Sequence, residues 1–259
     1  MKEVALITGA SSGIGKELAI IHAQKGRDLV ITARREVELN QLKHKLEQDY
    51  KIQVKVIVKD ISLPNAPEEI YQEIKNNNIN VKYLVNNAGF GGVRFFEEGD
   101  ITDDIAMINV NIIALTKLTK FFITDFKKDN QGKILNISSV ASLMPGPMQA
   151  TYFATKAYVT SLSNALVQEV KSYNITISTI MPGPTKSEFA KVAKMDQNVL
   201  FKKAYSSKSV AKDGYRAMEQ GKMNKLTGLP FWQKIGMKLL PFAPKKIVLQ
   251  AVMLMQKPK

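Results

Sequence analysis

The sequence of 259 residues contains no cysteine and only two histidines, His22 and His44. Without cysteine the protein cannot form a disulfide bond, use a thiolate as a nucleophile or bind zinc through sulfur. Two isolated histidines cannot build a histidine-rich metal site, so we predict that the protein has no metal centre. We place both histidines on helix surfaces.

The sequence also lacks a signal-peptide pattern, and no uninterrupted apolar stretch approaches the ~20 residues of a membrane-spanning helix. We therefore expect a cytoplasmic protein.

Acidic side chains are few. The sequence has 23 Asp and Glu residues and 37 Lys and Arg residues, which gives a net charge of +14. The lysines are dispersed and no aromatic nucleic-acid motif accompanies them. We interpret the charge as a solvated surface and expect no specific nucleic-acid partner.

Apolar runs rich in valine and isoleucine alternate with segments of helical periodicity, which is typical of βαβ units in a parallel sheet. Strands are expected near residues 4, 29–32, 54–58, 83–86, 134–138 and 175–180. We predict an α/β fold: a Rossmann-type, doubly wound parallel sheet in the order 3-2-1-4-5-6-7 with helices on both faces. With 45% apolar residues and no internal repeat or flexible linker, residues 1–259 should form a single domain.

A glycine-rich turn, TGASSGIG, follows the first predicted strand and opens a helix. Gly9 permits the tight turn, Gly13 lets the backbone approach a pyrophosphate, and Gly15 allows the helix to pack closely on the sheet. The helix N-terminus offers free N–H groups to phosphate, and Ser11 and Ser12 add hydroxyl donors. The spacing differs from the common G-x-G-x-x-G fingerprint, so the evidence for a dinucleotide site is the position of the turn after the strand.

Tyr152 and Lys156 are four residues apart and share one face of a predicted helix. A nearby cation favours the phenolate, so we expect Lys156 to lower the tyrosine pKa from about 10 and let Tyr152 exchange a proton near physiological pH. Ser139 ends the fifth predicted strand and would donate its hydroxyl to a substrate oxygen. Ser138 points to the other side of that strand and is interpreted as structural.

Four motifs in order resemble those of the short-chain dehydrogenase/reductase family, and the resemblance covers nearly the whole chain. They are TGASSGIG at residues 8–15, NNAG at residues 86–89, Ser139 with Tyr152 and Lys156, and the pair Pro182 and Gly183. Within the family the chain looks closest to acyl- and lipid-handling reductases that end in extra apolar helices.

The resemblance implies a set of catalytic roles. Tyr152 would protonate the developing alkoxide during reduction and act as the base in the reverse direction. Lys156 would also hold the nicotinamide ribose hydroxyls, and Asn111 would hold a water that links Lys156 to solvent. Asn109 is the competing candidate for that asparagine. The catalytic set predicted is therefore Asn111, Ser139, Tyr152 and Lys156.

The second strand ends in VITARRE, where NAD-preferring enzymes place an acid. Arg34, helped by Arg35, would instead bind a 2′-phosphate, so NADP(H) is favoured as the cofactor. Thr185 or Ser187 would bind the nicotinamide amide. The complete set of expected cofactor contacts is Gly9, Ser11, Ser12, Gly13, Ile14, Gly15, Arg34, Arg35, Asp60, Ile61, Asn87, Ala88, Gly89, Tyr152, Lys156, Pro182, Gly183 and Thr185.

An amphipathic lid is expected at about residues 186–208, with an apolar substrate pocket beneath it. Ordinary packing is an equal alternative for each of its apolar residues. The candidates are Phe90, Val93, Leu143, Met144, Met148, Phe189, Val199, Leu200 and Phe201.

The C-terminal region departs from the family pattern. KMNKLTG is a poor strand sequence that an edge position would tolerate. Residues 230–256 indicate two short amphipathic helices that carry Lys234, Lys238, Lys245 and Lys246. We favour packing of these helices against the enzyme or a second subunit over contact with an anionic membrane.

The sequence thus predicts an NADPH-dependent carbonyl reductase, reversible as an alcohol dehydrogenase, for an apolar ketone, aldehyde or secondary alcohol such as a 3-oxoacyl or steroid-like compound. The resemblance also implies a homodimer or homotetramer formed through the fourth and fifth helices. One alternative is a noncatalytic NADP-binding regulatory protein, against which the intact Ser139, Tyr152 and Lys156 argue. Another is a nucleic-acid-binding protein, which would require salt-dependent binding that survives loss of Arg34.

Overall fold

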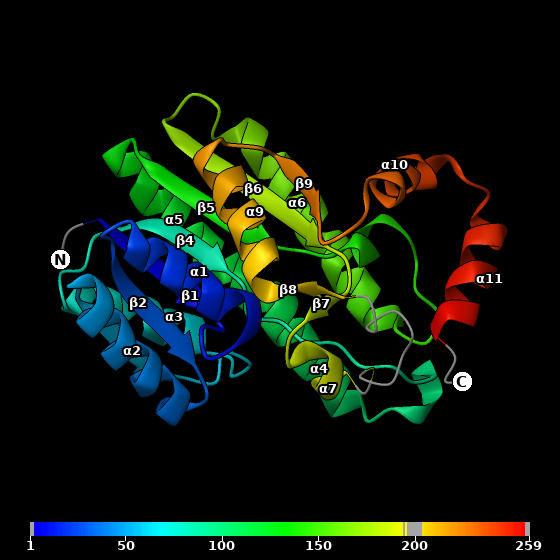
Figure 1. Ribbon diagram of the computed structural model, residues 1–259, viewed down its shortest axis with the longest axis horizontal. Helices are drawn as coiled ribbons and strands as arrows, with labels where there is room; N and C mark the ends of the chain where they lie inside the picture. Colours follow the sequence, from blue (N-terminus) through cyan, green and yellow to red (C-terminus); the bar gives the residue numbers. More distant parts are fainter. Residues whose placement is uncertain (1–2, 194, 196–203, 257–259) are drawn as a thin grey trace.

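The computed structural model describes residues 3–193, 195 and 204–256, and its centre is a seven-stranded parallel sheet between two layers of helices (Figure 1). The strand order is β3-β2-β1-β4-β5-β6-β9. Since β9 is the seventh strand of this sheet along the chain, the predicted doubly wound order is confirmed. The strands are β1 (Val4–Thr8), β2 (Asp28–Ala33), β3 (Val54–Val58), β4 (Val81–Asn86), β5 (Gly132–Ile137), β6 (Ile175–Pro182) and β9 (Asn224–Thr227).

The poor strand sequence near residue 224 does join the sheet, as β9. It pairs with β6 in parallel, from Thr179 opposite Asn224 to Pro182 opposite Thr227. As an edge strand, β9 needs hydrogen-bond partners on one side only, which explains why Asn224 and Lys225 are tolerated there.

Each face of the sheet has its own apolar core. One core joins the sheet to α1 (Gly13–Gln24), α2 (Glu36–Tyr50) and α9 (Ser207–Glu219). The other joins it to α3 (Ala66–Asn76), α5 (Leu115–Asp129) and the end of α6 (Ala150–Glu169). Because both faces are covered, the inner strands are buried along most of their length and do not alternate between buried and exposed residues.

Two helices and a π-helical turn form one long helix on the second face. α4 (Ile101–Ile108) continues through η2 (Asn109–Ala114) into α5, so that the helix runs over Ile101–Asp129. Among the described residues, this helix alone is long and, on average, apolar enough to cross a membrane, although polar residues such as Asn109 and Asn111 interrupt its apolar sequence. Its side chains Leu118, Phe122 and Phe126 belong to the core, and a core helix of a soluble protein passes the same test.

His22 is wrongly predicted as a surface residue, whereas His44 is exposed as expected. The His22 ring is fully buried between Tyr83 and Tyr215, at centroid distances of 5.4 and 5.3 Å. Burial and the nearby Arg27 guanidinium lower the pKa of His22 to about 3, so the side chain is neutral and acts as a packing group.

The short elements gather beyond the carboxyl ends of the strands. They are η1 (Phe96–Glu98), η3 (Val140–Leu143), β7 (Thr185–Lys186), α7 (Phe189–Val192), β8 (Tyr205–Ser206), α10 (Phe231–Leu239), η4 (Leu240–Phe242) and α11 (Lys245–Gln256). α10 and α11 occupy the segment where two amphipathic helices are predicted, and they stand at one end of the molecule (Figure 1). Of the predicted lid, Val199, Leu200 and Phe201 lie outside the described residues.

Candidate active site

A cleft of about 1170 Å³ opens where the strands of the sheet end. The carboxyl ends of parallel strands meet at one edge, so the loops that follow β1, β2, β3, β4, β5 and β6 all contribute to it. Fifteen of the residues expected to bind the cofactor line this cleft in addition to Tyr152 and Lys156, namely Gly9, Ser11, Ser12, Gly13, Ile14, Arg34, Arg35, Asp60, Ile61, Asn87, Ala88, Gly89, Pro182, Gly183 and Thr185.

The glycine turn is held in shape by Asn87, whose side-chain amide donates to the carbonyls of Thr8 and Gly9 at 2.9 and 3.1 Å. Gly9 and Gly13 have φ angles of +65° and +56°, which an L side chain rarely adopts. A Cβ at Gly15 would clash with the Asn87 amide nitrogen. Gly15 therefore serves close packing and does not line the cleft, whereas the backbone of Gly9 and Gly13 does.

The polar half of the cleft has the properties of a dinucleotide site. The N-terminus of α1 faces it, and the Ser12 side chain makes no hydrogen bond that caps this helix. The Arg34 side chain is 74% exposed, and its guanidinium lies 3.8 Å from a carboxylate oxygen of Asp60. The bare helix N-terminus suits the pyrophosphate of a nicotinamide dinucleotide, and the accessible guanidinium in the same cleft suits a further phosphate, such as the 2′-phosphate of NADP(H).

Arg35 is already engaged by its neighbours. Its guanidinium donates to both carboxylate oxygens of Glu188, at 3.1 and 2.7 Å, and to the Ser11 hydroxyl at 3.1 Å. Glu188 belongs to the predicted lid and Ser11 to the glycine turn, so this contact ties the lid to the end of the cleft where phosphate would bind. Arg34 is therefore the more accessible of the two arginines for a 2′-phosphate.

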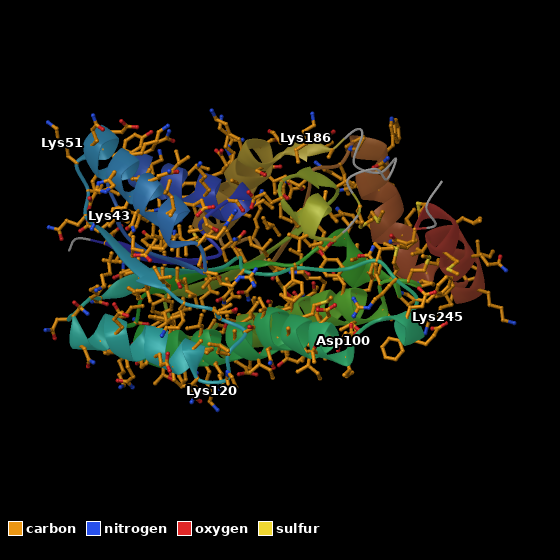
Figure 2. All side chains as sticks on the ribbon, turned by 90° about the horizontal axis from the view of Figure 1, so that it is seen from below. Lys43, Lys51, Asp100, Lys120, Lys186 and Lys245 are labelled. Carbon is orange, nitrogen blue, oxygen red and sulfur yellow. The ribbon has the colours of Figure 1, made fainter. Side chains whose placement is uncertain are left out.

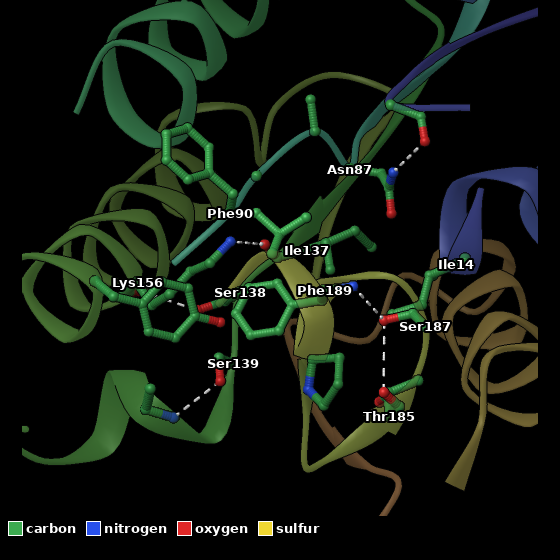
Figure 3. Close-up of a pocket in the computed structure, with 18 of the residues that line it drawn as sticks. Ile14, Asn87, Phe90, Ile137, Ser138, Ser139, Lys156, Thr185, Ser187 and Phe189 are labelled. Atoms are coloured by element: carbon green, nitrogen blue, oxygen red, sulfur yellow. Dashed lines mark hydrogen bonds between the residues drawn. The ribbon is translucent and has the colours of Figure 1, made fainter. Parts of the chain in front are cut away.

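Tyr152 and Lys156 lie on α6, buried at the centre of the cleft. The Lys156 ammonium donates to the Ile137 carbonyl at 2.9 Å (Figure 3) and lies 5.8 Å from the centre of the Tyr152 ring. Ser139 is the N-cap residue of η3, and its hydroxyl accepts from the Ala141 N–H at 3.1 Å (Figure 3).

Ser138, the neighbour of Ser139, has the structural position that the sequence predicts for it. Its hydroxyl donates to the Lys156 carbonyl at 3.0 Å and lies 2.7 Å from the Thr160 hydroxyl. These contacts hold the end of β5 against α6. The spacing of β5 and α6, and with it the distance between Ser139 and Tyr152, is thus fixed from behind the site.

Burial, not Lys156, sets the pKa of Tyr152 in the free protein. Burial raises the pKa of Tyr152 to about 12, and the hydrogen bond between the Ser139 and Tyr152 side chains opposes this only in part. Burial also lowers the pKa of Lys156 to about 8. The expectation that Lys156 lowers the tyrosine pKa is therefore wrong here. At neutral pH Tyr152 holds its proton and is suited to act as an acid.

Asn111 lies in the π-helical turn η2, buried behind the cleft rather than lining it. Its amide donates to the Phe90 carbonyl and to the Thr155 hydroxyl, both at 3.0 Å, and its oxygen accepts from the Phe90 N–H at 3.2 Å. A Cβ at Gly89 would lie 3.0 Å from that oxygen and 3.2 Å from the Lys156 ammonium nitrogen. Asn111, rather than the half-buried Asn109, is therefore the asparagine beside the site.

The other half of the cleft is apolar. Phe90, Met144 and Phe189 line it as predicted, and the Phe189 ring packs 5.4 Å from that of Tyr152. Among the described residues around the cleft, Val93, Leu143 and Met148 do not line it. Leu143 instead packs against the cluster around Met181, because the turn of η3 directs it toward β6 and β9.

Thr185 and Ser187 both line the cleft, so the choice between them as the amide ligand stays open. The Thr185 hydroxyl donates to the Gly183 carbonyl at 2.9 Å. The Ser187 hydroxyl donates to the Thr185 carbonyl at 3.5 Å and accepts from the Phe189 N–H at 3.3 Å (Figure 3).

Sequence reasoning missed a polar pair within the apolar half. The Gln149 amide donates to the Gln256 side-chain oxygen at 2.7 Å and to the Met195 sulfur at 3.5 Å, and both glutamines are buried and line the cleft. The pair fastens α11 to the start of α6. The position of Gln149, three residues before Tyr152, could have indicated that it lies near the site. No sequence pattern predicts that Gln256 is its hydrogen-bond partner.

The family of the protein follows from its match to known sequences. Residues 3–198 match the model of the short chain dehydrogenase family. The chain belongs to this family. Proteins of this family are oxidoreductases that use a nicotinamide cofactor.

Known family members resemble the chain in sequence and in fold. Very-long-chain 3-oxoacyl-CoA reductase of Mus musculus is 32% identical over 198 residues, which are 74% of this chain but only 62% of that relative. The short-chain dehydrogenase from Sphingobium yanoikuyae in complex with NADPH is 27% identical, with a TM-score of 0.83 over 90% of this chain and 92% of that one. A family member from Burkholderia phymatum in complex with NAD shares the fold, at 22% identity and a TM-score of 0.81 over 92% of each chain.

We predict that Lys156→Met stabilises the free protein at pH 7. Lowering the lysine pKa from 10.5 to about 8 corresponds to about 3 kcal/mol of unfavourable charge burial, against about 1 kcal/mol for the hydrogen bond to Ile137. The free energy of unfolding in urea should rise by about 2 kcal/mol.

The pH dependence tests the cause of this gain. Between pH 8 and 10.5 the unfolded wild-type chain binds the proton that the folded lysine has lost, so wild-type stability rises with pH and the advantage of Lys156→Met disappears. Lys120→Met, at an exposed position of α5, should show no such trend. A difference between wild type and Lys156→Met that does not change with pH would contradict the account.

Proposed function

We propose that the protein is an NADPH-dependent reductase of apolar ketones or aldehydes, reversible with the corresponding secondary alcohols. The observation that carries the proposal is the position of Tyr152. This protonated, buried phenol lies with Ser139 where the polar and apolar halves of one cleft meet. A carbonyl compound in the apolar half would thus meet an acid beside the site for the cofactor.

The chain's own groups perform the proton chemistry. The Ser139 hydroxyl donates a hydrogen bond to the substrate carbonyl oxygen and polarises it, and the Tyr152 hydroxyl donates its proton to the same oxygen as negative charge develops. When bound, the nicotinamide supplies a hydride to the carbonyl carbon or accepts one in the reverse reaction. Lys156 supplies a buried positive charge next to the phenolate that remains on Tyr152.

Preference for NADPH rests on Arg34. Its exposed guanidinium stands at the end of β2, where an acid would repel a 2′-phosphate, and it can form charge-assisted hydrogen bonds to such a group. The NADPH complex of the Sphingobium relative supports this assignment. The NAD complex of the Burkholderia structure, at 22% identity, bears on the fold alone.

The substrate class follows from the apolar half of the cleft. Its walls come from η3, α6, α7, α10 and α11, and the described residues there are mainly methionine, phenylalanine and valine. Such a lining favours an aliphatic chain or fused rings next to the reacting carbonyl, as in a 3-oxoacyl or steroid-like compound. The name of the mouse relative, a very-long-chain 3-oxoacyl-CoA reductase, supports the acyl alternative.

A noncatalytic NADP-binding regulator is the second candidate. The observation that favours a regulator is the ion pair between Arg35 and Glu188 of the predicted lid. A cofactor phosphate that binds Arg35 would break this ion pair and release Glu188, and a partner protein could respond to that change. The same cleft would then bind NADPH without consuming it.

Replacing Tyr152 tests the proposed acid. Tyr152→Phe removes only the hydroxyl, so turnover should fall about a thousandfold while the affinity for NADPH changes by less than about twofold. The matched control is Tyr158→Phe, on the same helix, whose hydroxyl lies 3.1 Å from that of Thr116 and should be dispensable. Turnover retained by Tyr152→Phe would remove this residue as the proton donor.

Replacing Arg34 tests the phosphate site. Arg34→Asp should change the ratio of kcat/KM for NADPH to kcat/KM for NADH by about a hundredfold in favour of NADH, because a carboxylate repels the 2′-phosphate. Arg216→Asp, at an exposed position of α9 with no ion pair among the described residues, makes the same charge change elsewhere. An equal ratio in wild type and Arg34→Asp would refute the assignment.

A further inference from the structure

The outer face of the C-terminal helices is apolar and unpartnered in the described structure. α10 has no buried residue, and at Trp232 and Phe242 the exposed fractions reach 78% and 86%. We call this surface, formed by α10, η4 and α11, the tail face. Its most exposed apolar side chains are Phe231, Trp232, Leu239, Phe242, Ile247 and Leu254.

The charged side chains of the tail face are all positive. After Glu219 the sequence contains no acidic residue at all. Lys234, Lys238, Lys245 and Lys246 lie on α10 and α11, and none of the four forms an ion pair within the described part of the chain. Figure 2 places Lys245 at the end of the molecule formed by these two helices, away from Lys51.

This combination is that of an interfacial helix pair. Aromatic and leucine side chains beside lysines, without acids, match helices that lie in the headgroup region of a bilayer, where the lysines meet anionic phosphates. A protein partner fits less well, because lysine is depleted in the cores of protein interfaces. We propose that the tail face docks on the surface of a bilayer that contains anionic phospholipid.

The inner side of the same helices forms part of the cleft. Met237 of α10 and Val252 of α11 line it, and the Gln149–Gln256 hydrogen bond of 2.7 Å fastens α11 to α6. Docking therefore places the apolar half of the cleft next to the bilayer. An apolar substrate dissolved in lipid would reach Tyr152 past α10 and α11 without crossing water, a consequence that rests on the proposed function.

Trp232 is the only tryptophan of the chain, so its fluorescence reports on the tail face directly. Vesicles of phosphatidylcholine with phosphatidylglycerol should shift its emission to shorter wavelength, and brominated acyl chains in the same vesicles should quench it. Pure phosphatidylcholine vesicles should bind at least about tenfold more weakly, because the lysines then lack anionic partners. The full chain is used without cofactor or substrate, so the result does not depend on catalysis.

Variants separate the two contributions. Neutralising the four lysines, as Lys234→Gln, Lys238→Gln, Lys245→Gln and Lys246→Gln together, should weaken vesicle binding about a hundredfold. Trp232→Ser with Phe242→Ser should weaken it about tenfold in co-sedimentation and leave turnover of a small water-soluble ketone unchanged. The control for the charges neutralises four exposed lysines outside the tail face, as Lys45→Gln, Lys51→Gln, Lys120→Gln and Lys128→Gln together. The control for the apolar change is Val37→Ser with Leu63→Ser, and both controls should bind as wild type does.

Two results would overturn the proposal. Emission of Trp232 that is unaffected by anionic vesicles would do so, even in a protein that reduces ketones normally. So would a shift that grows with protein concentration in the absence of lipid and resists brominated acyl chains, because it would assign the tail face to a second copy of the chain. A protein that reduces no ketone but binds anionic vesicles through the four lysines would contradict the proposed function and leave the docking proposal supported.

Discussion

The common direction of the seven strands is the constraint on which the site depends. In a parallel sheet every strand ends at the same edge, so the loops after all seven strands converge there from distant parts of the chain. The glycine turn after β1, Arg34 after β2, Asn87 after β4, Ser139 after β5 and Pro182 at the end of β6 become neighbours for this reason alone. Reversing one strand would remove its loop from the cleft.

The proposed reaction would use ionisable groups that are buried here, although their charged forms would be more stable in water. Tyr152 is kept protonated and Lys156 is brought close to losing its proton, and in both cases the cause is burial. The Ile137 carbonyl is the hydrogen-bond partner of the ammonium, and Ser138, Thr155 and Asn111 hold the surrounding elements in place. These surrounding contacts therefore keep Tyr152 and Lys156 buried, although burial disfavours the charged form of each side chain. Such perturbed pKa values are typical of functional sites.

The sequence was sufficient for the sheet order, the family and the residues that gather at the cleft, because these follow from local patterns at strand ends. It failed where a property depends on surroundings. His22 has a surface-like position in α1 and is buried only because Tyr83 and Tyr215 close over it. The pKa of Tyr152 is raised by burial, which the spacing of Tyr152 and Lys156 does not reveal. The Gln149–Gln256 pair joins residues far apart in the chain, as does the Arg35–Glu188 contact.

The most direct test of the central claim is consumption of NADPH by the purified protein in the presence of apolar carbonyl compounds. NADPH is first titrated by fluorescence, and its oxidation is then followed with ketones, aldehydes and 3-oxoacyl thioesters of increasing chain length. A reductase with this cleft should bind NADPH and convert at least one member of the series to the corresponding alcohol, with one NADPH oxidised for each carbonyl reduced. Tight binding of NADPH with no turnover across the series would contradict the account and favour a regulatory protein.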